Sequence, residues 1–305
     1  MDTTQKQVLR VLGGEQVTFD ASMKPHTTFH VGGTADAFYD SHDLTELSEM
    51  IAYLSRERIP YFVIGNGSNI LVRDSGIRGV VIHLSGALAG IEQNRSDSHT
   101  LIAGGGLPIK DLLIHCRDLG LSGLEFMAGI PGSIGGAAAM NAGAFGWEMC
   151  DWVEGIRLVT PQGSIVERDK EALIFSYRRL ELERGSVIAS VSVRLAAASK
   201  TAISKKMSDC LKWRKQHQPL DYRSAGSVFK NPPSDYAGRL IEAAGLKGRR
   251  VAGAVVSKRH ANFIVNKGNA TAADILKLMG LIQEEVKRRS GIQLEPEIQV
   301  VGDVA

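Results

Sequence analysis

Two glycine-rich segments carry residues that could hold the phosphates of a nucleotide. The first, GNGSNILV (65–72), follows the apolar run Tyr61-Phe-Val-Ile64. Glycines let a backbone approach an anion closely, and successive backbone N–H groups in such a turn can point at phosphate oxygens. The segment is neither GxGxxG nor GxxxxGK followed by Ser or Thr, so the mechanisms of those motifs do not apply. Taken alone, a tight turn after a strand is the simpler interpretation.

The second segment, GIPGSIGGAAAMNAGAFG (129–146), makes larger demands on the backbone. Residues 134–140 can start a helix, and the first N–H groups of a helix are available to an anion. The small residues 137–139 would let a flat ring or another backbone lie close. The alternative is a packed helix corner. Two phosphate-compatible segments in one chain favour a dinucleotide ligand.

Together with other motifs, these segments resemble the UDP-N-acetylenolpyruvoylglucosamine reductase family, a member of the flavin-binding superfamily that includes vanillyl-alcohol oxidase. The matching motifs run in order over nearly the whole chain, so the resemblance is specific. They are HTTFHVGG (26–33), GNGSNILV (65–72), GLSGLEFMAGIPGSIGGAAAMNAGAFG (120–146), FSYR (175–178), GSVFKNP (226–232), AGRLIEAAGLKG (237–248), HANFIVN (260–266) and LEPEIQ (294–299).

The resemblance implies an α+β fold, in which a two-lobed FAD-binding domain of the vanillyl-alcohol oxidase type precedes a C-terminal α+β substrate domain. Its lobes would cover 1–84 with a returning strand at 296–305, then 85–202, and the substrate domain 203–295. FAD would be bound non-covalently. The residues expected to contact it are Gly65, Asn66, Gly67, Ser68, Asn69, Gly129, Ile130, Pro131, Ser133, Gly135, Gly136, Asn141, Gly143 and Ala144.

The resemblance also implies a reaction: reduction of UDP-N-acetylglucosamine enolpyruvate to UDP-N-acetylmuramate in peptidoglycan synthesis. NADPH would reduce FAD and leave as NADP, and the enolpyruvyl substrate would take its place. Hydride then adds to the terminal carbon of the enol ether, and a proton adds to the carbon that bears the carboxylate. Because negative charge develops on that carboxylate, the site needs a fixed cation, a hydrogen-bonding acid and a proton donor.

The resemblance assigns these roles to Arg178, Glu297 and Ser227. The planar guanidinium of Arg178 can hold a carboxylate through two bonds and stays charged. The alternative is a surface arginine beside Arg179. Ser227 would transfer the proton to the substrate carbon, and the alternative is a turn hydroxyl that bonds its own backbone.

Glu297 is one of two carboxylates in LEPEIQ, and the resemblance selects it over Glu295. Burial favours the protonated form of a carboxyl group, which could then donate a hydrogen bond to the developing enolate. Pro296 between the two carboxylates fits an edge strand or a bulge. The alternative is an exposed carboxylate on an edge strand, which is our interpretation of Glu295.

Lys215, Lys230 and Asn231 are candidates for binding the UDP moiety. A lysine can neutralise a diphosphate, and the amide can bond uracil or phosphate. An equally good interpretation is that these three residues do not bind the substrate, since lysines are common on protein surfaces. None of the eight histidines stands in a ligand pair, and the three cysteines are widely spaced, so neither a metal site nor a disulfide is predicted.

The sequence departs from the family's pattern in two places. The longer subclass has a tyrosine-bearing loop after its YR motif, whereas here Tyr177-Arg178 is followed within ten residues by a predicted strand from Ser186. The chain therefore resembles the compact subclass, which must cover its substrate in another way. The family often has a serine two residues after the arginine, where Leu180 stands here.

Hydrophobic periodicity predicts the elements that must position these residues. A capping box of Thr271 and Asp274 precedes the last predicted helix, which has apolar residues up to Val286. The other predicted helices cover 41–58, 108–119, 134–140 and 199–217. Strands are predicted at 37–39, 61–64, 80–84, from 101 to the glycines at 104–106, 153–160, 164–167, 186–195 and 292–301, with a hairpin turn at 161–163. Glycine loops interrupt the alternation, which favours mixed α+β lobes over a regular βα repeat.

The composition narrows the class of protein. Apolar residues make up 44% and charged residues 23%, as in an ordinary globular chain. Lys and Arg number 36 against 33 for Asp and Glu, an excess too small to argue for nucleic acid or an anionic membrane. The uncharged stretch 126–147 contains six glycines, which is typical of a ligand cradle rather than a membrane helix. Without a secretory signal pattern, we expect a protein of the reducing cytoplasm.

Two other functions share parts of this pattern. An oxidase of the same flavin superfamily, acting on an alcohol or sugar, would have the same FAD lobes, so that only GSVFKNP and LEPEIQ separate it from the reductase. A non-catalytic flavin- or nucleotide-binding protein would not need Arg178, Ser227 and Glu297 together.

Overall fold

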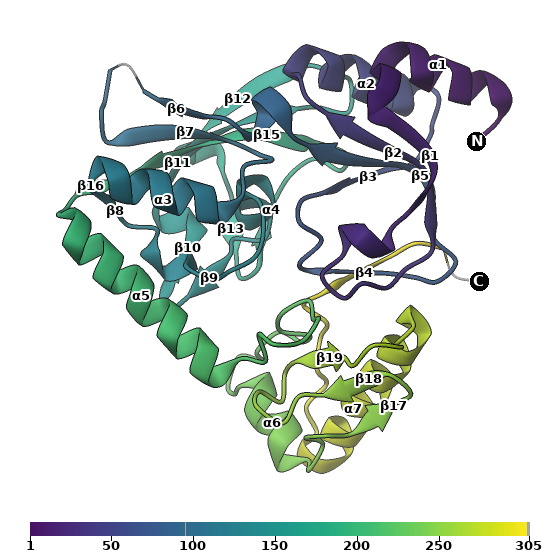
Figure 1. Cartoon of the computed structure of the whole chain (residues 1–305), viewed down its shortest axis with the longest axis vertical. Helices are drawn as coiled ribbons and strands as arrows, with labels where there is room; N and C mark the ends of the chain where they lie inside the picture. Colours follow the sequence, from purple (N-terminus) through teal and green to yellow (C-terminus); the bar gives the residue numbers. More distant parts are fainter. Residues whose placement is uncertain (95, 304–305) are drawn as a thin grey trace. The chain divides into compact units, whose positions relative to one another are not determined.

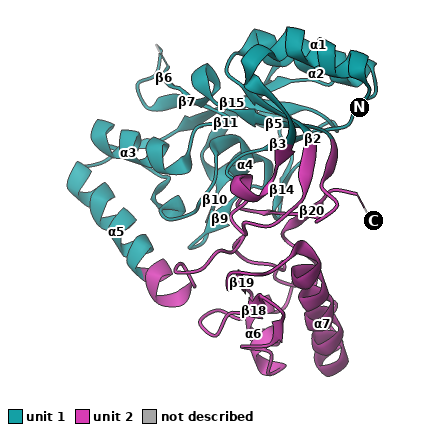
Figure 2. Cartoon of the chain, turned by 45° about the vertical axis from the view of Figure 1, so that its right-hand side comes forward, with its two compact units in different colours: residues 1–20, 36–66, 79–212 teal, residues 21–35, 67–78, 213–305 magenta. Residues whose placement is uncertain are grey.

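The computed structural model describes residues 1–94 and 96–303 of the chain (Figure 1). Two compact units form, each from separate stretches of sequence (Figure 2). The boundary after Lys212 falls inside helix α5 (Lys200–His217). Unit 1 comprises residues 1–20, 36–66 and 79–212, and unit 2 comprises residues 21–35, 67–78 and 213 onward.

The larger sheet of unit 1 is antiparallel, with the strand order β12-β11-β15-β7-β6. The predicted hairpin is confirmed, because β11 and β12 pair across a turn in which Gly163 has a φ of 82° and donates its N–H to the Thr160 carbonyl at 2.8 Å. The strands are β6 Ile91–Gln93, β7 Thr100–Gly104, β11 Val153–Val159, β12 Ile165–Asp169 and β15 Val187–Arg194. Shorter pairs are formed by β8 Leu121–Ser122 with β16 Ala196–Ala197, β9 Gly143–Ala144 with β10 Trp147–Glu148, and β13 Phe175–Ser176 with β14 Arg179–Leu180.

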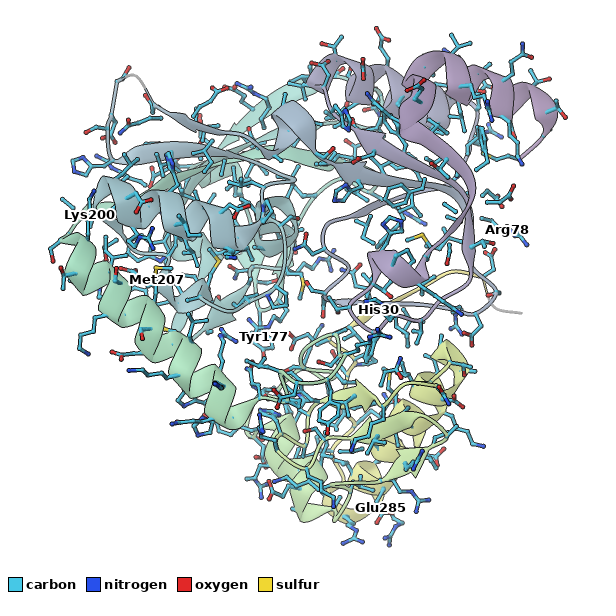
Figure 3. All side chains as sticks on the ribbon, viewed as in Figure 1. His30, Arg78, Tyr177, Lys200, Met207 and Glu285 are labelled. Carbon is cyan, nitrogen blue, oxygen red and sulfur yellow. The ribbon has the colours of Figure 1, made fainter. Side chains whose placement is uncertain are left out.

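Helices α3 (Ile109–Leu119), α4 (Ile134–Ala139) and the first part of α5 share a hydrophobic core with this sheet. On α5, Met207 packs against that core, and Lys200 is exposed at the beginning of the helix (Figure 3). Lys206 donates to the hydroxyl of Ser122 at 3.1 Å and lies 3.7 Å from the buried carboxylate of Glu125. Both apolar packing and polar contacts therefore hold α5 to unit 1.

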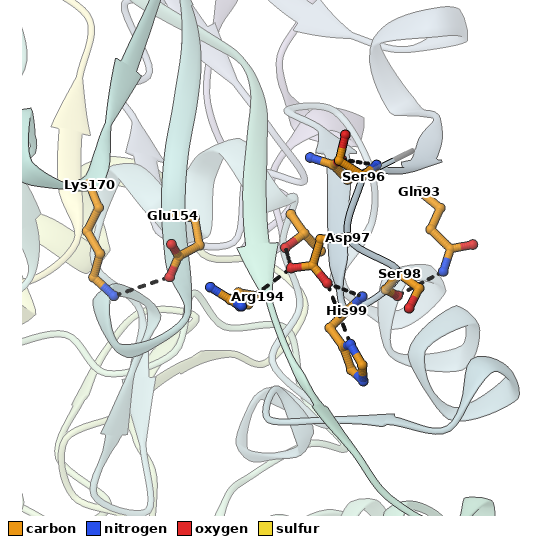
Figure 4. A network of polar contacts seen from close by, with 10 residues as sticks. Gln93, Ser96, Asp97, Ser98, His99, Glu154, Lys170 and Arg194 are labelled. Atoms are coloured by element: carbon orange, nitrogen blue, oxygen red, sulfur yellow. Dashed lines mark hydrogen bonds and ion pairs between the residues drawn. The ribbon is translucent and has the colours of Figure 1, made fainter.

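Asp97 organises the connection between β6 and β7 (Figure 4). Its carboxylate accepts the backbone N–H of His99 at 3.0 Å and the hydroxyl of Thr100 at 2.9 Å. It also lies 3.5 Å from the guanidinium of Arg194 on β15. The backbone bond from His99, followed by the Thr100 hydroxyl, holds the pKa of Asp97 below its usual value. The charged Asp97 carboxylate thus fixes the residues that lead into β7, which have few apolar side chains to bury.

The smaller sheet has the order β1-β2-β5-β3 and runs mainly through unit 1. Its strands β3 and β5 are parallel, with Tyr61 opposite Val80. Helix α2 (Leu44–Arg56) begins at Asp43, whose side chain accepts the N–H groups of the first turn, and its apolar face is fully buried against this sheet. The strands are β1 Val17–Ser22, β2 Thr34–Ser41, β3 Tyr61–Ile64 and β5 Ile77–Leu84.

Unit 2 has its own core, around a three-stranded antiparallel sheet β17-β18-β19, two helices and a parallel pair of β4 with β20. The capping box of Thr271 and Asp274 is confirmed, with both reciprocal bonds present. The predicted apolar face of that helix is buried from Ile275 to Val286. The elements are β4 Ile70–Val72, α6 Ala237–Ala243, β17 Arg250–Val251, β18 Ala254–Val256, β19 Ile264–Asn266, α7 Ala272–Ser290 and β20 Gln299–Val301.

The structure corrects the prediction of the last strand, which covers 299–301 rather than 292–301. Pro296 has no N–H to donate to a ladder and forms only an isolated bridge with Phe229. Helix α1 (Thr3–Gly13) was not predicted, although its Asp2–Gln5 capping box is visible in the sequence. The division of the chain into three lobes stays a prediction. No helix among residues 1–94 and 96–303 has the length and apolar character needed to cross a membrane.

Asp74 caps helix α7 from a distant part of the sequence. Its two carboxylate oxygens accept the N–H groups of Ala272 at 3.0 Å and Ala273 at 2.9 Å, which ties the segment 67–78 to α7 within unit 2. We expect Asp74→Ala to lower the free energy of unfolding by about 1 kcal/mol, the usual cost of a lost cap, in urea denaturation. Asp118→Ala removes an exposed carboxylate that pairs with the adjacent Arg117 and serves as the control. Equal losses in the two variants would contradict the capping role.

Candidate active site

The beginning of the first glycine-rich segment lies against the second within unit 1. Gly65 follows β3, and a Cβ at this position would collide with the hydroxyl of Ser133 in the second segment. A Cβ on Gly135 would lie 2.9 Å from the carbonyl oxygen of Gly105. Gly135 therefore permits a close approach to the backbone of Gly105, whereas a Cβ at Gly65 would have to displace the Ser133 side chain. The residues fit a cradle for a dinucleotide, because the two phosphate-compatible segments are adjacent.

The N-terminus of α4 does not offer the N–H groups that we predicted for an anion. Ile134 donates to the Leu107 carbonyl at 2.9 Å, and Gly135 donates to the Gly105 carbonyl at 2.8 Å. The N–H of Gly136 is bonded to the hydroxyl of Ser133 at 3.3 Å. That prediction is wrong, because the neighbouring turn and the N-cap side chain already satisfy the first turn of the helix. Phosphate contacts must come from other groups of the cradle.

Residues 67–69 continue the first segment into unit 2. Thr28, in HTTFHVGG, donates both its backbone N–H and its hydroxyl to the Gly67 carbonyl, at 3.1 and 3.3 Å. Gly67 has a φ of 59°, and a Cβ there would collide with the carbonyl of His26. Asn69 donates its side-chain amide to the Glu297 carbonyl at 3.1 Å. One predicted FAD contact, Asn69, therefore bonds the backbone of one predicted catalytic residue.

Arg178 is the second residue of the two-residue turn between β13 and β14. Its φ of 62° is uncommon for a residue other than glycine. The guanidinium lies 4.9 Å from the centre of the Tyr177 ring, and one of its nitrogens is 3.1 Å from the place that a Cβ on Gly143 would occupy. Arg178 is half-buried, whereas Arg179 is exposed. The two arginines therefore have different environments, and the role of Arg178 stays a prediction.

Asn141 holds the two hairpins beside Arg178 together. Only 1% of this residue is exposed. Its amide nitrogen donates to Glu148 at 2.8 Å and to the Ser176 carbonyl at 3.2 Å, while its oxygen accepts the N–H of Cys150 at 3.0 Å. Because the side chain makes these three protein bonds, a contact of Asn141 with FAD would involve its backbone.

Ser227 and Glu297 are brought together in unit 2 by the backbone. The N–H of Glu297 donates to the Val228 carbonyl at 2.8 Å, one residue after Ser227. The preceding Gly226 has a φ of 75°, which lets the chain turn before Ser227. Both Ser227 and Glu297 are half-buried, and Glu295 is exposed as expected. Arg178 belongs to unit 1.

The three candidates for binding UDP are placed differently. The Lys230 ammonium lies 3.7 Å from the Glu295 carboxylate, and the Lys230 side chain is 37% exposed while that of Glu295 is 74% exposed. The side-chain oxygen of Asn231 accepts the N–H of Ala237 at 3.0 Å, at the beginning of α6. Lys215 is exposed near the end of α5. Asn231 thus has a structural role, while the lysine side chains are accessible.

The sequence analysis did not single out Asn262, which contacts the backbone beside Ser227. It lies in the turn between β18 and β19 and is 4% exposed. The signal was present, because an asparagine inside the apolar run that leads to β19 is a polar side chain that must find partners when it is buried.

Comparison with known proteins gives matches over nearly the whole chain. A family model described as FAD binding domain matches residues 35–169, and one described as UDP-N-acetylenolpyruvoylglucosamine reductase, C-terminal domain, matches residues 218–301. A reductase of that name from Desulfosudis oleivorans is 42% identical over 99% of this chain and 100% of its own. Another, from Caldanaerobacter subterraneus, is 44% identical over 92% of each chain.

A solved structure gives the same match in three dimensions. The crystal structure of UDP-N-acetylenolpyruvylglucosamine reductase from Thermus caldophilus is 37% identical and aligns with a TM-score of 0.80 over 93% of this chain and 97% of its own. The predicted α+β class is confirmed, with an FAD-binding domain followed by a C-terminal domain.

Replacing Gly65 tests the cradle. We expect Gly65→Ala to weaken FAD binding by at least about tenfold, roughly 1.4 kcal/mol, because its Cβ must displace Ser133. The dissociation constant can be measured by flavin fluorescence during titration of the apoprotein. Gly280→Ala, in α7 with nothing within 4 Å of its Cβ, is the matched control and should bind FAD normally. Normal binding by Gly65→Ala would remove this glycine from the cradle.

Proposed function

The chain belongs to the UDP-N-acetylenolpyruvoylglucosamine reductase family, and we propose that it reduces UDP-N-acetylglucosamine enolpyruvate to UDP-N-acetylmuramate with NADPH and FAD. The observation that carries this function is the identity of 42% over 99% of the chain with a reductase of that name. An oxidase of the same superfamily would share only the FAD-binding domain. The match of residues 218–301 to the reductase C-terminal domain therefore favours the reductase.

FAD, when bound, accepts a hydride from NADPH and passes it to the double bond of the substrate. The close packing of Gly65 on the Ser133 segment supports the assignment of these two loops as its cradle. The glycines there let the two loops pack closely on neighbouring parts of the chain, which larger side chains would prevent. The small residues of 135–139 serve the same purpose.

Arg178 is proposed to bind the carboxylate of the enolpyruvyl group. A guanidinium can hold both oxygens and stabilise the negative charge that develops on them. The positive φ of Arg178 supports this role, because residues other than glycine with such strained backbones cluster at functional sites. Gly143 leaves space beside the guanidinium, and Asn141 fixes the turn that carries it.

Ser227 is proposed to deliver a proton from its hydroxyl, and Glu297 to donate a hydrogen bond to the developing enolate. The bond between Glu297 and Val228 supports a shared role, because it couples the backbone positions of the two residues. Together the hydride and the proton saturate the double bond, so the reaction consumes one NADPH and one proton. Lys215 remains a candidate for the diphosphate, since its side chain is exposed.

A paired measurement of the two half-reactions tests the proposed function. NADPH should bleach the flavin of the wild-type protein under anaerobic conditions, and the enolpyruvyl substrate should restore it. In Ser227→Ala we expect normal bleaching and reoxidation slowed by about 10²–10⁴-fold, because only the second step needs the proton. Ser208→Ala, a serine on α5, should resemble the wild type. If the enolpyruvyl substrate does not restore the flavin absorbance of the reduced wild-type protein, the proposed function is wrong.

Arg178→Lys examines the role of the guanidinium. A lysine keeps the charge but cannot reproduce the two-pronged bond, so we expect substrate-dependent reoxidation to slow by about 10²-fold while reduction by NADPH is unchanged. Stopped-flow absorbance of the flavin measures both rates. The neighbouring exposed Arg179→Lys provides the matched control. A wild-type reoxidation rate in Arg178→Lys would remove Arg178 from the mechanism.

A further inference from the structure

The segment that follows Ser227 is hydrogen bonded on both sides. On one side, the Val228 carbonyl accepts the N–H of Glu297 at 2.8 Å, and Lys230 donates its N–H to the Glu295 carbonyl at 2.9 Å. This pairing resembles that of two strands, although only an isolated bridge between Phe229 and Pro296 forms. Residues 228 and 229 are 1% exposed, so their remaining polar groups need partners from the protein.

Asn262 provides those partners on the other side. Its side-chain oxygen accepts the N–H of Phe229 at 3.0 Å, and its side-chain nitrogen donates to the Phe229 carbonyl at 2.8 Å. Its own carbonyl accepts the N–H of Val228 at 2.9 Å. A primary amide has the donor and acceptor of a peptide group, so Asn262 takes the place of a neighbouring strand. Three bonds from one residue fix the backbone beside Ser227.

The turn that carries Asn262 is itself held in place. Ser257 accepts the N–H of Arg259 at 3.1 Å and of His260 at 3.3 Å through its hydroxyl, and its own N–H donates to the Phe263 carbonyl at 2.8 Å. The N–H of Asn262 donates to Nδ1 of His260 at 3.2 Å. Burial and then the nearby Lys247 lower the pKa of His260, which favours the neutral ring that can accept this bond.

We propose that Asn262 is a positioning residue for the reduction, which holds Ser227 and Glu297 in register through the backbone of residues 228–229. The inference rests on the proposed function. The Asn262 side chain bonds Phe229, and its backbone carbonyl bonds Val228. Asn262 therefore acts on Ser227 and Glu297 through the backbone of these two residues. Because the Asn262 amide bonds both the N–H and the carbonyl of Phe229, this backbone can neither slide along its own direction nor rotate about it. Either movement would shift the Ser227 hydroxyl.

Loss of this amide should affect the second half-reaction selectively. Proton delivery depends on the placement of the donor to within a fraction of an ångström, and a misplacement of about 1 Å can cost 10²-fold in rate. We expect Asn262→Ala to be reduced by NADPH at the wild-type rate and reoxidised by the enolpyruvyl substrate about 10²-fold more slowly. Its solvent deuterium isotope effect on reoxidation should exceed that of the wild type, because the proton transfer becomes limiting.

A matched control separates positioning from loss of structure. Asn266 is also a buried asparagine of unit 2, 5% exposed, at the end of β19. Its amide bonds the Phe29 carbonyl at 2.9 Å and the N–H of Gly268 at 2.8 Å, away from Ser227 in the sequence. Asn266→Ala should lose stability like Asn262→Ala, as judged by thermal unfolding of the holoenzyme, without the selective slowing of reoxidation.

The double variant shows whether Asn262 acts through Ser227. If it does, the double variant Ser227→Ala with Asn262→Ala loses clearly less than the product of the two single losses in reoxidation rate, because one of the two groups being positioned is already absent. Should Asn262→Ala not fold, Asn262→Asp takes its place, since it keeps the size of the side chain and the acceptor for the Phe229 N–H but sets an acceptor oxygen where the donor to the Phe229 carbonyl stood.

Two results would overturn the proposal: equal slowing of both half-reactions by the Asn262 variant, or additive losses in the double variant. Failure of the proposed function looks different, because it would already be seen in the wild-type protein as a flavin that the enolpyruvyl substrate does not reoxidise.

Discussion

Buried backbone that has no neighbouring strand must find its hydrogen bonds elsewhere, and this constraint governs the irregular parts of the chain. The protein meets it with short side chains that carry an amide or a carboxylate. Asn262 bonds the backbone at Phe229, and Asn141 bonds the turn before Arg178. Asp74 does the same at the first turn of α7. Each of these side chains joins segments that the regular ladders of the sheets do not reach.

The proposed catalytic residues depend on this arrangement. Arg178 and Ser227 both lie at turns. Arg178 itself has a positive φ, and Ser227 follows Gly226, which also has one. A turn alone would leave the backbone that carries each side chain free to move. Such movement reduces the benefit of placing a charge or a proton donor near the substrate. In both cases a buried asparagine fixes the adjacent backbone, through Ser176 in unit 1 and through Phe229 in unit 2. The polar interior thus provides rigidity at positions where a helix or strand cannot.

Much of the fold could be predicted from the sequence because its signals are local. The spacing of apolar residues identified α2 and α7, and the Thr271–Asp274 pair identified the beginning of α7. The contacts of the site were harder, because they join distant residues. Nothing in the sequence near Ile134 shows that the carbonyls of Leu107 and Gly105 accept the first N–H groups of α4. Nothing near Pro296 shows that residues 295–298 pair with the segment 228–230. Asn262 is 33 residues from its partner Phe229. Such bonds depend on the finished fold, and motif resemblance identifies residue types without their partners.

The pairing of β20 with β4 has a consequence for how the chain is made. Gln299 lies opposite Ile70, so β4 remains without this neighbour until more than 220 further residues have been synthesised and β20 has left the ribosome. Bringing such distant segments together also carries an entropic cost that grows with the length of the intervening chain. Unit 1 holds most of its sheet contacts within residues 79–212 and has no such requirement. Unit 2 is therefore expected to complete its structure last during biosynthesis, with its β4 edge exposed to chaperones in the interval.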